Sequence, residues 1–298
     1  MKLIKPSFEI YEQGPGLEDI YEAIERAGRT CYKSSRPEGQ TAKNFVDRMI
    51  ASQHYAMLEH GTVYLKFESI VHVFGRGYLG GMKYIGNHYS KVDIEGTTQY
   101  VTTNYRVLVE NDWLDDLKYL CEPTEFHEKR ITVHFVCDRG VSHEFVRHRV
   151  FSFAQESTRY CNYSKDKFGN ELTFIIPSWY NKETDSAVKL KFLNYLTTTE
   201  GLYLDLLRGS YWAKKVIEGG ATYEKFENIE KVFAPLTPQQ ARQVLPNALK
   251  TELVMTGFVS DWEHFFDLRA RGTTGAPHPD AKVLAEPLMG EFYKRNLI

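Results

Sequence analysis

Short apolar stretches, several of them alternating with polar residues, predict five strands in this chain. They cover residues 2–11, 62–67, 131–137, 172–176 and 251–259. The alternation is clearest in the third stretch, where Ile131, Val133, Phe135 and Cys137 occupy every second position. Because side chains along a strand point to opposite faces in turn, this pattern indicates a strand with one buried face.

Apolar residues at helical spacing predict helices over residues 17–26, 41–53, 141–147, 185–218, 261–269 and 280–294. In the longest of them, Gly201 marks a candidate break. Strands and helices follow one another without a regular alternation, which favours an α+β fold. No linker divides the chain, so we predict a single compact domain over residues 1–298, with a mixed sheet flanked by helices.

One stretch does not fit this pattern. Residues 75–111 hold six glycines among tyrosines and polar residues. Glycine clusters indicate turns and irregular backbone, so we expect an irregular insertion that includes a short hairpin. Its sequence indicates no role.

The composition is that of an ordinary globular protein. Hydrophobic residues make up 42% of the 298 residues and charged residues 26%, and the formal net charge is -2. A near-neutral chain has no overall field that attracts nucleic acid or an anionic membrane. No apolar run reaches the roughly 18 residues of a membrane-spanning helix, and the N-terminus lacks the apolar core of a signal peptide. We therefore expect a cytoplasmic protein with no membrane or nucleic-acid partner.

The cysteines and histidines indicate no metal site. Cys31, Cys121, Cys137 and Cys161 are widely spaced and form no Cys-x-x-Cys pair. Reduced thiols fit this spacing better than a disulfide framework or a structural zinc site. The ten histidines include no His-Glu-x-x-His arrangement either.

Positive charge gathers in residues 139–165, which hold five Lys or Arg residues and two acids. A small basic island on a near-neutral chain suits a compact anion such as a phosphate ester. Arg147, His148 and Arg149 stand at its centre. Residues two apart on a helix point to different sides, so either a helix ends near them or the two arginines serve different ligands. Taken alone, the triplet is better explained as a solvated charged face.

Ser157, Thr158 and Arg159 follow in a polar stretch. Hydroxyl and backbone N–H groups near an arginine can bind a phosphate, although an ordinary turn has the same composition. Ser157 has no base at a recognisable spacing, which argues against a catalytic nucleophile.

Three motifs together resemble the flavin-dependent thymidylate synthases. Arg147-His148-Arg149, followed by Ser157 after seven residues, resembles the signature of that family, within the longer match DRGVSHEFVRHRVFSFAQESTRYCNYS. The segment HYAMLEH, residues 54–60, resembles the earlier element that lies at the flavin. The segments ARQVLP and WEHFFDLR, which begin at Ala241 and Trp262, resemble the C-terminal nucleotide-binding part.

The resemblance implies an α+β enzyme that methylates dUMP to dTMP. The carbon would come from 5,10-methylenetetrahydrofolate and the hydride from FAD reduced by NADPH. The residues implied at FAD are His54, Glu59, Arg147, His148, Arg149, Gln155 and His264. The residues implied at dUMP are Glu144, Arg147, Gln155, Glu156, Ser157, Thr158, Arg159, Arg242 and Arg269. A homotetramer with active sites shared between subunits is implied as well, and no metal.

Arg269 matches the arginine that the family places at the uracil ring, so we expect it to be the catalytic residue. Uracil C5 is a poor nucleophile, and loss or weakening of the N3 proton raises its electron density. A fixed guanidinium beside O2, N3 or O4 stabilises that anionic form and lowers the pKa of the ring. The resemblance gives Cys161 no role.

Several positions depart from the family pattern. Glu144 stands where some members have glutamine, Ala56 where a hydroxyl residue is usual, and His264 where some have asparagine. Residues 272–280 form a longer stretch than expected, in which His278 is a further candidate for FAD.

Two other functions remain open from the sequence. A different flavoprotein, such as a reductase on the same scaffold, would keep the flavin-side residues without needing Ser157, Arg159, Arg242 and Arg269 together. A nucleic-acid-binding protein would use the basic island for phosphate contacts and its aromatic neighbours for stacking.

Overall fold

A computed structural model describes residues 1–68, 80–208, 212–217, 220–225 and 235–298, the short segments 212–217 and 220–225 by their backbone alone. Contacts within the chain group into two compact units. The larger unit holds residues 7–137, 141–156 and 252–298, and the smaller unit holds residues 1–6, 138–140 and 157–251.

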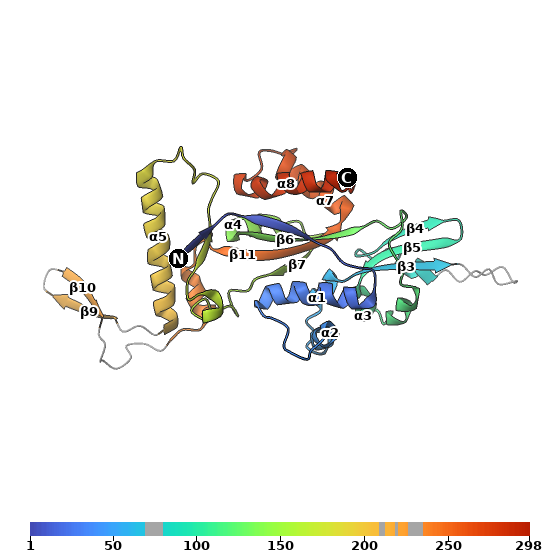
Figure 1. Ribbon diagram of the computed structural model, residues 1–298, viewed down its shortest axis with the longest axis horizontal. Helices are drawn as coiled ribbons and strands as arrows, with labels where there is room; N and C mark the ends of the chain where they lie inside the picture. The colour runs from blue at the N-terminus through green and yellow to red at the C-terminus, as the bar shows by residue number, and fades with distance from the viewer. Residues whose placement is uncertain (69–79, 209–211, 218–219, 226–234) are drawn as a thin grey trace. The chain divides into compact units, whose positions relative to one another are not determined.

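The larger unit is built on a four-stranded sheet with the order β2 (Ser7–Tyr11), β6 (Arg130–Asp138), β11 (Lys250–Phe258) and β7 (Ser152–Gln155). Helices α7 (Val259–Phe266) and α8 (Pro279–Lys294) cover one face, and α1 (Leu17–Tyr32) lies on the other (Figure 1). The period of two along β11 explains this layering. Leu253 and Met255 are buried in the same core cluster as α7 and α8, while Val254 is buried with α1.

A second sheet in the same unit has the order β3 (Thr62–Glu68), β5 (Thr98–Asn104) and β4 (Lys91–Glu95), all antiparallel. Around it lie α2 (Ala42–Ala51), α3 (Tyr105–Glu110) and the 3-10 turns η1 (Tyr55–His60), η2 (Gly80–Tyr84) and η3 (Leu114–Tyr119).

This sheet corrects the expectation of an irregular insertion over residues 75–111. The predicted hairpin is present as β4 and β5, but β5 also pairs along its whole length with β3. Two of the glycines have a structural role in or beside this sheet. Gly96 takes a φ of 61° in the hairpin turn, and a Cβ on Gly81 would lie 2.8 Å from the amide oxygen of Gln99. Residues 75–79 lie outside the described residues.

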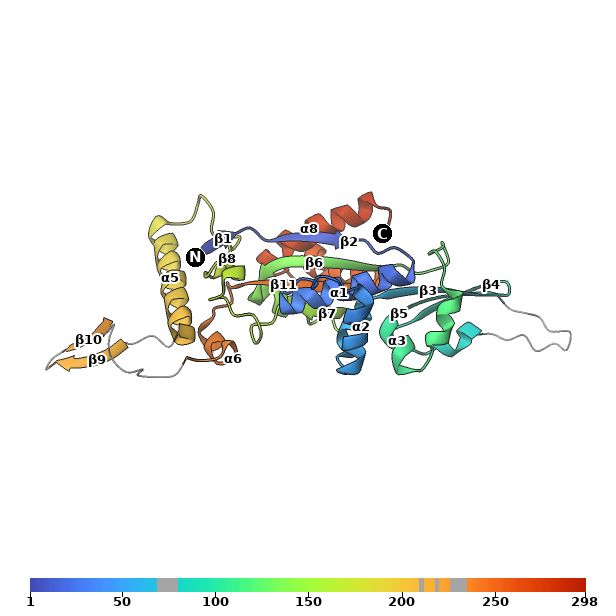
Figure 2. The ribbon, with the colours of Figure 1, turned by 60° about the horizontal axis from the view of Figure 1, so that its bottom comes forward.

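The smaller unit pairs β1 (Lys2–Ile4) in parallel with β8 (Thr173–Ile175) and packs them against the long helix α5 (Ser186–Arg208) (Figure 2). It also holds the hairpin of β9 (Trp212–Ile217) and β10 (Gly220–Lys225), the short helix α6 (Pro238–Ala241) and the turns η4 (Asp166–Phe168) and η5 (Arg242–Val244).

Three predicted elements have wrong boundaries. The strand predicted over residues 2–11 is divided into β1 and β2, because Pro6 has no N–H for a ladder. The helix predicted over residues 185–218 runs through Gly201 without a break but ends at Arg208, and residues 212–217 form a strand. The helix predicted over residues 17–26 begins where expected but continues to Tyr32. The other predicted strands and helices are present within a few residues of their expected ends, and the α+β class is confirmed.

Two short elements position the motif residues. Helix α4 (Arg139–Phe145) follows β6, and a π-helical turn, η6 (Asp267–Arg271), extends α7. All four cysteines are described and none forms a disulfide; Cys137 is buried in the larger unit and Cys161 in the smaller. No helix among the described residues is long and apolar enough to cross a membrane.

Candidate active site

Arg269 is held from three directions by the motif segment. Its Nε donates to Nε2 of His148 at 3.0 Å, Nη1 donates to the Glu144 carboxylate at 2.5 Å, and Nη2 donates to the Glu144 carbonyl oxygen at 2.9 Å. The π-turn η6 carries Arg269, and α4 carries Glu144. A guanidinium has five N–H groups, so one on each terminal nitrogen is left unused by these three bonds.

His148 is the neutral partner in this cluster. Burial, with help from the nearby Arg269 charge, lowers the pKa of His148 to about 4. A neutral ring that accepts from Arg269 at Nε2 carries its proton on Nδ1. His264 of α7 lies beside it, with ring centroids 6.1 Å apart. Four of the predicted site residues, Glu144, His148, His264 and Arg269, are therefore gathered in one place.

Arg147 and Arg149 both point outward from the turn after α4. Helix α4 ends at Phe145, before both arginines. The helix therefore does not force their side chains to different sides, and one site can use both. Both side chains are exposed, and neither guanidinium bonds to a residue that the structure describes. Arg149 lines a pocket of about 460 Å³ in the larger unit. Such unsatisfied guanidiniums are available for an anionic ligand.

Gln155 and Glu156 lie at the end of β7. Nε2 of Gln155 donates to the Ser142 hydroxyl at 2.8 Å, and the Glu156 backbone N–H donates to the Glu252 carbonyl at 2.8 Å. Glu156 is buried, with 1% of its surface exposed.

Of the flavin-side candidates, His54 directly precedes η1 and Glu59 lies within it. The Tyr32 hydroxyl lies 3.0 Å from Nδ1 of His54. The Glu59 carboxylate accepts from Arg106 at 2.5 Å, so this acid already has a cationic partner. Neither residue is bonded to the Arg269 cluster.

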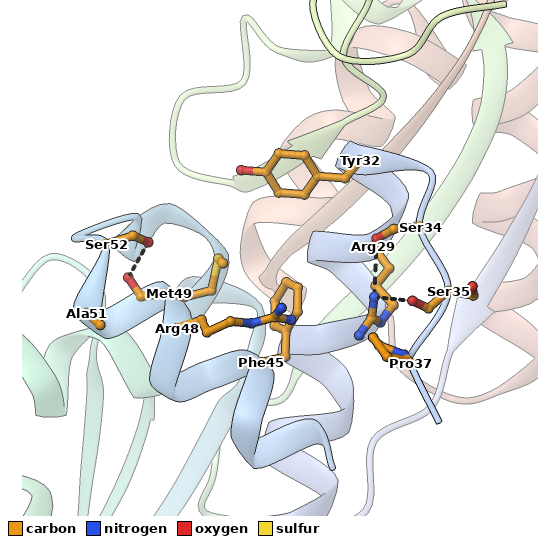
Figure 3. A pocket seen from close by; sticks show the side chains of 10 residues that line it. All are labelled: Arg29, Tyr32, Ser34, Ser35, Pro37, Phe45, Arg48, Met49, Ala51 and Ser52. Atoms are coloured by element: carbon orange, nitrogen blue, oxygen red, sulfur yellow. Dashed lines mark hydrogen bonds between the residues drawn. The ribbon is translucent and has the colours of Figure 1, made fainter. Parts of the chain in front are cut away.

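Tyr32 also borders a wide pocket of about 700 Å³ between α1 and α2 (Figure 3). Phe45 is among its lining residues, and its ring lies 5.3 Å from the Arg29 guanidinium and 5.6 Å from that of Arg48. Arg29 is already bonded to Ser34 and to the backbone of residue 35. None of the predicted site residues lines this pocket, so its size alone does not make it the active site.

The remaining dUMP candidates, Ser157, Thr158, Arg159 and Arg242, lie in the smaller unit. Nε of Arg159 donates to the Gln239 amide oxygen at 3.2 Å, and the Arg159 backbone N–H donates to the Ser157 hydroxyl at 3.3 Å. Thr158 is buried. Arg242 begins η5, three residues after Gln239, and its exposed guanidinium bonds to no described residue. In the larger unit, His278 lies at the exposed start of α8, and its side chain bonds to no described residue.

A second set of charged residues was not predicted from the sequence. Arg130, Lys91 and Asp261 line the pocket of Arg149. Burial lowers the pKa of Arg130 to about 10 and raises the pKa of Asp261. None of the three stands in a motif, and a lone Arg at the start of a strand carries no signal of burial.

Comparisons with known proteins agree with the motifs. The profile of the family described as "Thymidylate synthase complementing protein" matches residues 90–295. A flavin-dependent thymidylate synthase of Corynebacterium efficiens is 33% identical over 151 residues, which cover 49% of this chain and 50% of that protein. One of Mycolicibacterium gilvum is 24% identical over 263 residues, which cover 87% of this chain and 69% of that protein. This chain thus spans about half the length of the first of these relatives and about two thirds of the second.

A solved structure, the UMP/dUMP methylase PolB from Streptomyces cacaoi bound with 5-Br UMP, covers 99% of this chain and 92% of its own at 14% identity and a TM-score of 0.44. A likeness that weak carries no argument. The family profile, in contrast, spans well over half of the chain and includes both the motif segment and Arg269. The chain belongs to the thymidylate synthase complementing protein family.

Proposed function

We propose that this chain is a flavin-dependent thymidylate synthase, which methylates dUMP to dTMP with 5,10-methylenetetrahydrofolate as carbon donor and NADPH as the source of reducing power. Family membership and the names of the curated relatives support the proposal. The observation that carries it is the anchored Arg269. Glu144 and His148 fix its guanidinium while one N–H on each terminal nitrogen stays unused.

In this proposal Arg269 polarises the uracil ring. Its guanidinium stabilises negative charge on the ring oxygens and N3, which raises electron density at C5. A preorganised cation costs no reorganisation when the charge develops, and the three bonds to Glu144 and His148 provide that preorganisation. Cys161 is fully buried, so attack on uracil by its thiolate forms no part of the proposal.

The arginines fit the phosphates of the other ligands. Arg147 and Arg149, with unsatisfied guanidiniums, would hold FAD, with His54, Glu59, His148, Gln155 and His264 on the flavin side. When bound, FAD supplies the hydride that completes the methyl group. For dUMP, the phosphate would bind Ser157, Thr158, Arg159 and Arg242, and Glu144, Gln155 and Glu156 would contact the rest of the nucleotide.

The test is anaerobic conversion of dUMP. Purified protein, FAD, NADPH and 5,10-methylenetetrahydrofolate are mixed with dUMP, and dTMP is measured by chromatography. Formation of dTMP that depends on every component is the expected result. NADPH oxidation without dTMP would favour the flavoprotein reductase, and a protein that binds no flavin would overturn both.

We further propose that the enzyme is a homotetramer whose active sites use residues of more than one subunit. Light scattering on the purified protein should give four times the mass of one chain. An active monomer would overturn this part of the proposal and leave the reaction untouched.

A further inference from the structure

The pocket beside Arg149 is formed by segments far apart in the sequence. Its lining comes from the start of the hairpin β4–β5, from β6, from the turn after α4 and from the junction of β11 and α7, all within the larger unit. The lining residues that matter here are Lys91, Arg130, Arg149, Phe258 and Asp261. Lys91 belongs to the segment 75–111, to which the sequence assigned no role.

This pocket holds more positive than negative charge. Three permanent cations line it, against the single carboxylate of Asp261. Nζ of Lys91 lies 5.5 Å from the centre of the Phe258 ring, and the Arg130 guanidinium lies 5.6 Å from the same ring. Lys91 reaches its nearest carboxylate, that of Glu128, only at 3.8 Å.

Neither arginine is fully satisfied by the chain. Arg130 is 8% exposed, and its buried Nε has no hydrogen-bond partner among the described residues. The Arg149 guanidinium bonds to no described residue at all. Like charges gathered in one pocket repel one another, and an anion bound among them relieves that repulsion.

We propose that Lys91 is a second cationic contact, beside Arg149, for the diphosphate of FAD. The inference rests on the proposed function, because it uses the flavin assignment of Arg149. Two cations delivered by separate segments suit a ligand with two neighbouring negative groups. The hairpin β4–β5 then has a binding role: it carries Lys91 to the flavin site.

The test compares FAD with riboflavin, which has the same isoalloxazine ring but lacks both the diphosphate and the adenosine. Binding to flavin-free protein is followed by quenching of flavin fluorescence for the wild type, Lys91→Ala, Lys91→Arg and Arg149→Ala. Lys66→Ala is the matched control, because Lys66 lies on β3 of the same sheet, is partly exposed and pairs with Glu68 at 3.0 Å. Thermal unfolding of each variant checks that the fold is intact.

We expect Lys91→Ala to raise the Kd for FAD about tenfold, the usual loss for one charge-assisted bond. Riboflavin affinity should be unchanged, Lys91→Arg should recover most of the FAD affinity, and Lys66→Ala should change neither ligand.

Three results would overturn the inference while leaving the proposed function standing. The first is a Lys91→Ala variant that binds FAD as the control does. The second is an equal loss for FAD and riboflavin, which would mean that Lys91 does not act through phosphate. The third is a loss confined to dUMP, measured by calorimetry, which would give the pocket to the nucleotide. A wild type that binds no FAD would overturn the proposed function itself.

Discussion

At the residue scale, the bonds of Arg269 define what its loss should do. The Arg269→Ala variant should lose dTMP formation by at least about 100-fold, the usual cost of removing a preorganised charge that the transition state needs. Its NADPH oxidation through bound FAD should stay near the wild-type rate, because reduction of the flavin needs no uracil activation. Arg269→Lys should recover little activity. An ammonium lacks the planar geometry needed to bond at once to His148, to the Glu144 carboxylate and to the Glu144 backbone carbonyl.

The measurements are dTMP yield and NADPH consumption on the same samples. Ser157→Ala serves as the comparison, because that hydroxyl is expected only to help hold dUMP, and it should keep measurable activity. Full dTMP synthesis by Arg269→Ala, or a trapped adduct between dUMP and Ser157 or Cys161, would contradict the mechanism.

Glu144 allows a finer test of the same cluster. The carboxylate accepts from Nη1 of Arg269, and a glutamine at this position keeps an acceptor oxygen while an alanine does not. Glu144→Gln should therefore keep most of the kcat, whereas Glu144→Ala should lose about tenfold because Arg269 is less firmly oriented. Steady-state kinetics with varied dUMP separates the two, and an equal loss in both variants would mean that the charge, not the positioning, matters.

Sequence motifs predicted the residues of the Arg269 cluster. They singled out Arg269, His148 and Glu144, and the structure places these three in contact. They left open whether the Glu144 carboxylate pairs with an arginine, because the contact with Arg269 joins residues 125 positions apart. Lys91 and Arg130 were missed for a related reason: their significance lies in a shared pocket, and no spacing along the chain encodes it.

At the element scale, replacing a glycine by alanine should have opposite effects on the free energy of unfolding at two positions. A Cβ on Gly257 of β11 would lie 2.5 Å from the ring of Phe151, which is buried against Trp262. Gly257→Ala should lower the free energy of unfolding by about 1–3 kcal/mol through overpacking. Gly201 lies within α5 with nothing within 4 Å of its added Cβ, so Gly201→Ala should raise the free energy of unfolding by about 0.5–1 kcal/mol.

Urea unfolding of both variants beside the wild type measures the two shifts. A neutral Gly257→Ala would show that the Phe151 ring can move aside at no cost. A destabilising Gly201→Ala would show that α5 bends at that glycine after all.

Elements with strong periodicity were predictable, and elements defined by their partners were not. β6 and α1 stand out because one face is apolar. The strands β4 and β5 lie in a glycine- and tyrosine-rich stretch, and their existence depends on pairing with β3. Residues 212–217 continue the apolar content of α5, so the sequence could not separate that strand from the helix.

At the scale of the whole molecule, two buried histidines make stability depend on pH. The pKa of His60 is lowered to about 3 and that of His148 to about 4, in both cases mainly by burial. Below the ordinary histidine pKa of roughly 6.5, these two histidines become protonated in the unfolded chain but stay neutral in the folded chain. The free energy of unfolding should therefore fall as the pH drops from about 6.5 towards 4, by up to about 1.4 kcal/mol per pH unit for each histidine.

The variant His148→Gln isolates one of these contributions, because the amide oxygen can still accept from Arg269. Urea unfolding at pH 7, 5.5 and 4.5 should give a shallower fall for the variant than for the wild type. Parallel curves would mean that His148 takes up its proton as readily in the folded chain as in the unfolded one.

The alkylation rates of the two buried cysteines can report separately on the opening of each unit. Cys137 and Cys161 have no exposed surface and lie in different units, so a thiol reagent reaches each only when its own surroundings open. With Cys31 and Cys121 replaced by alanine, the rate at which each remaining thiol is alkylated in low urea reports how often that unit opens. If both thiols are alkylated at one rate, the chain opens as a single cooperative unit. If the two alkylation rates differ, the two units open independently of each other.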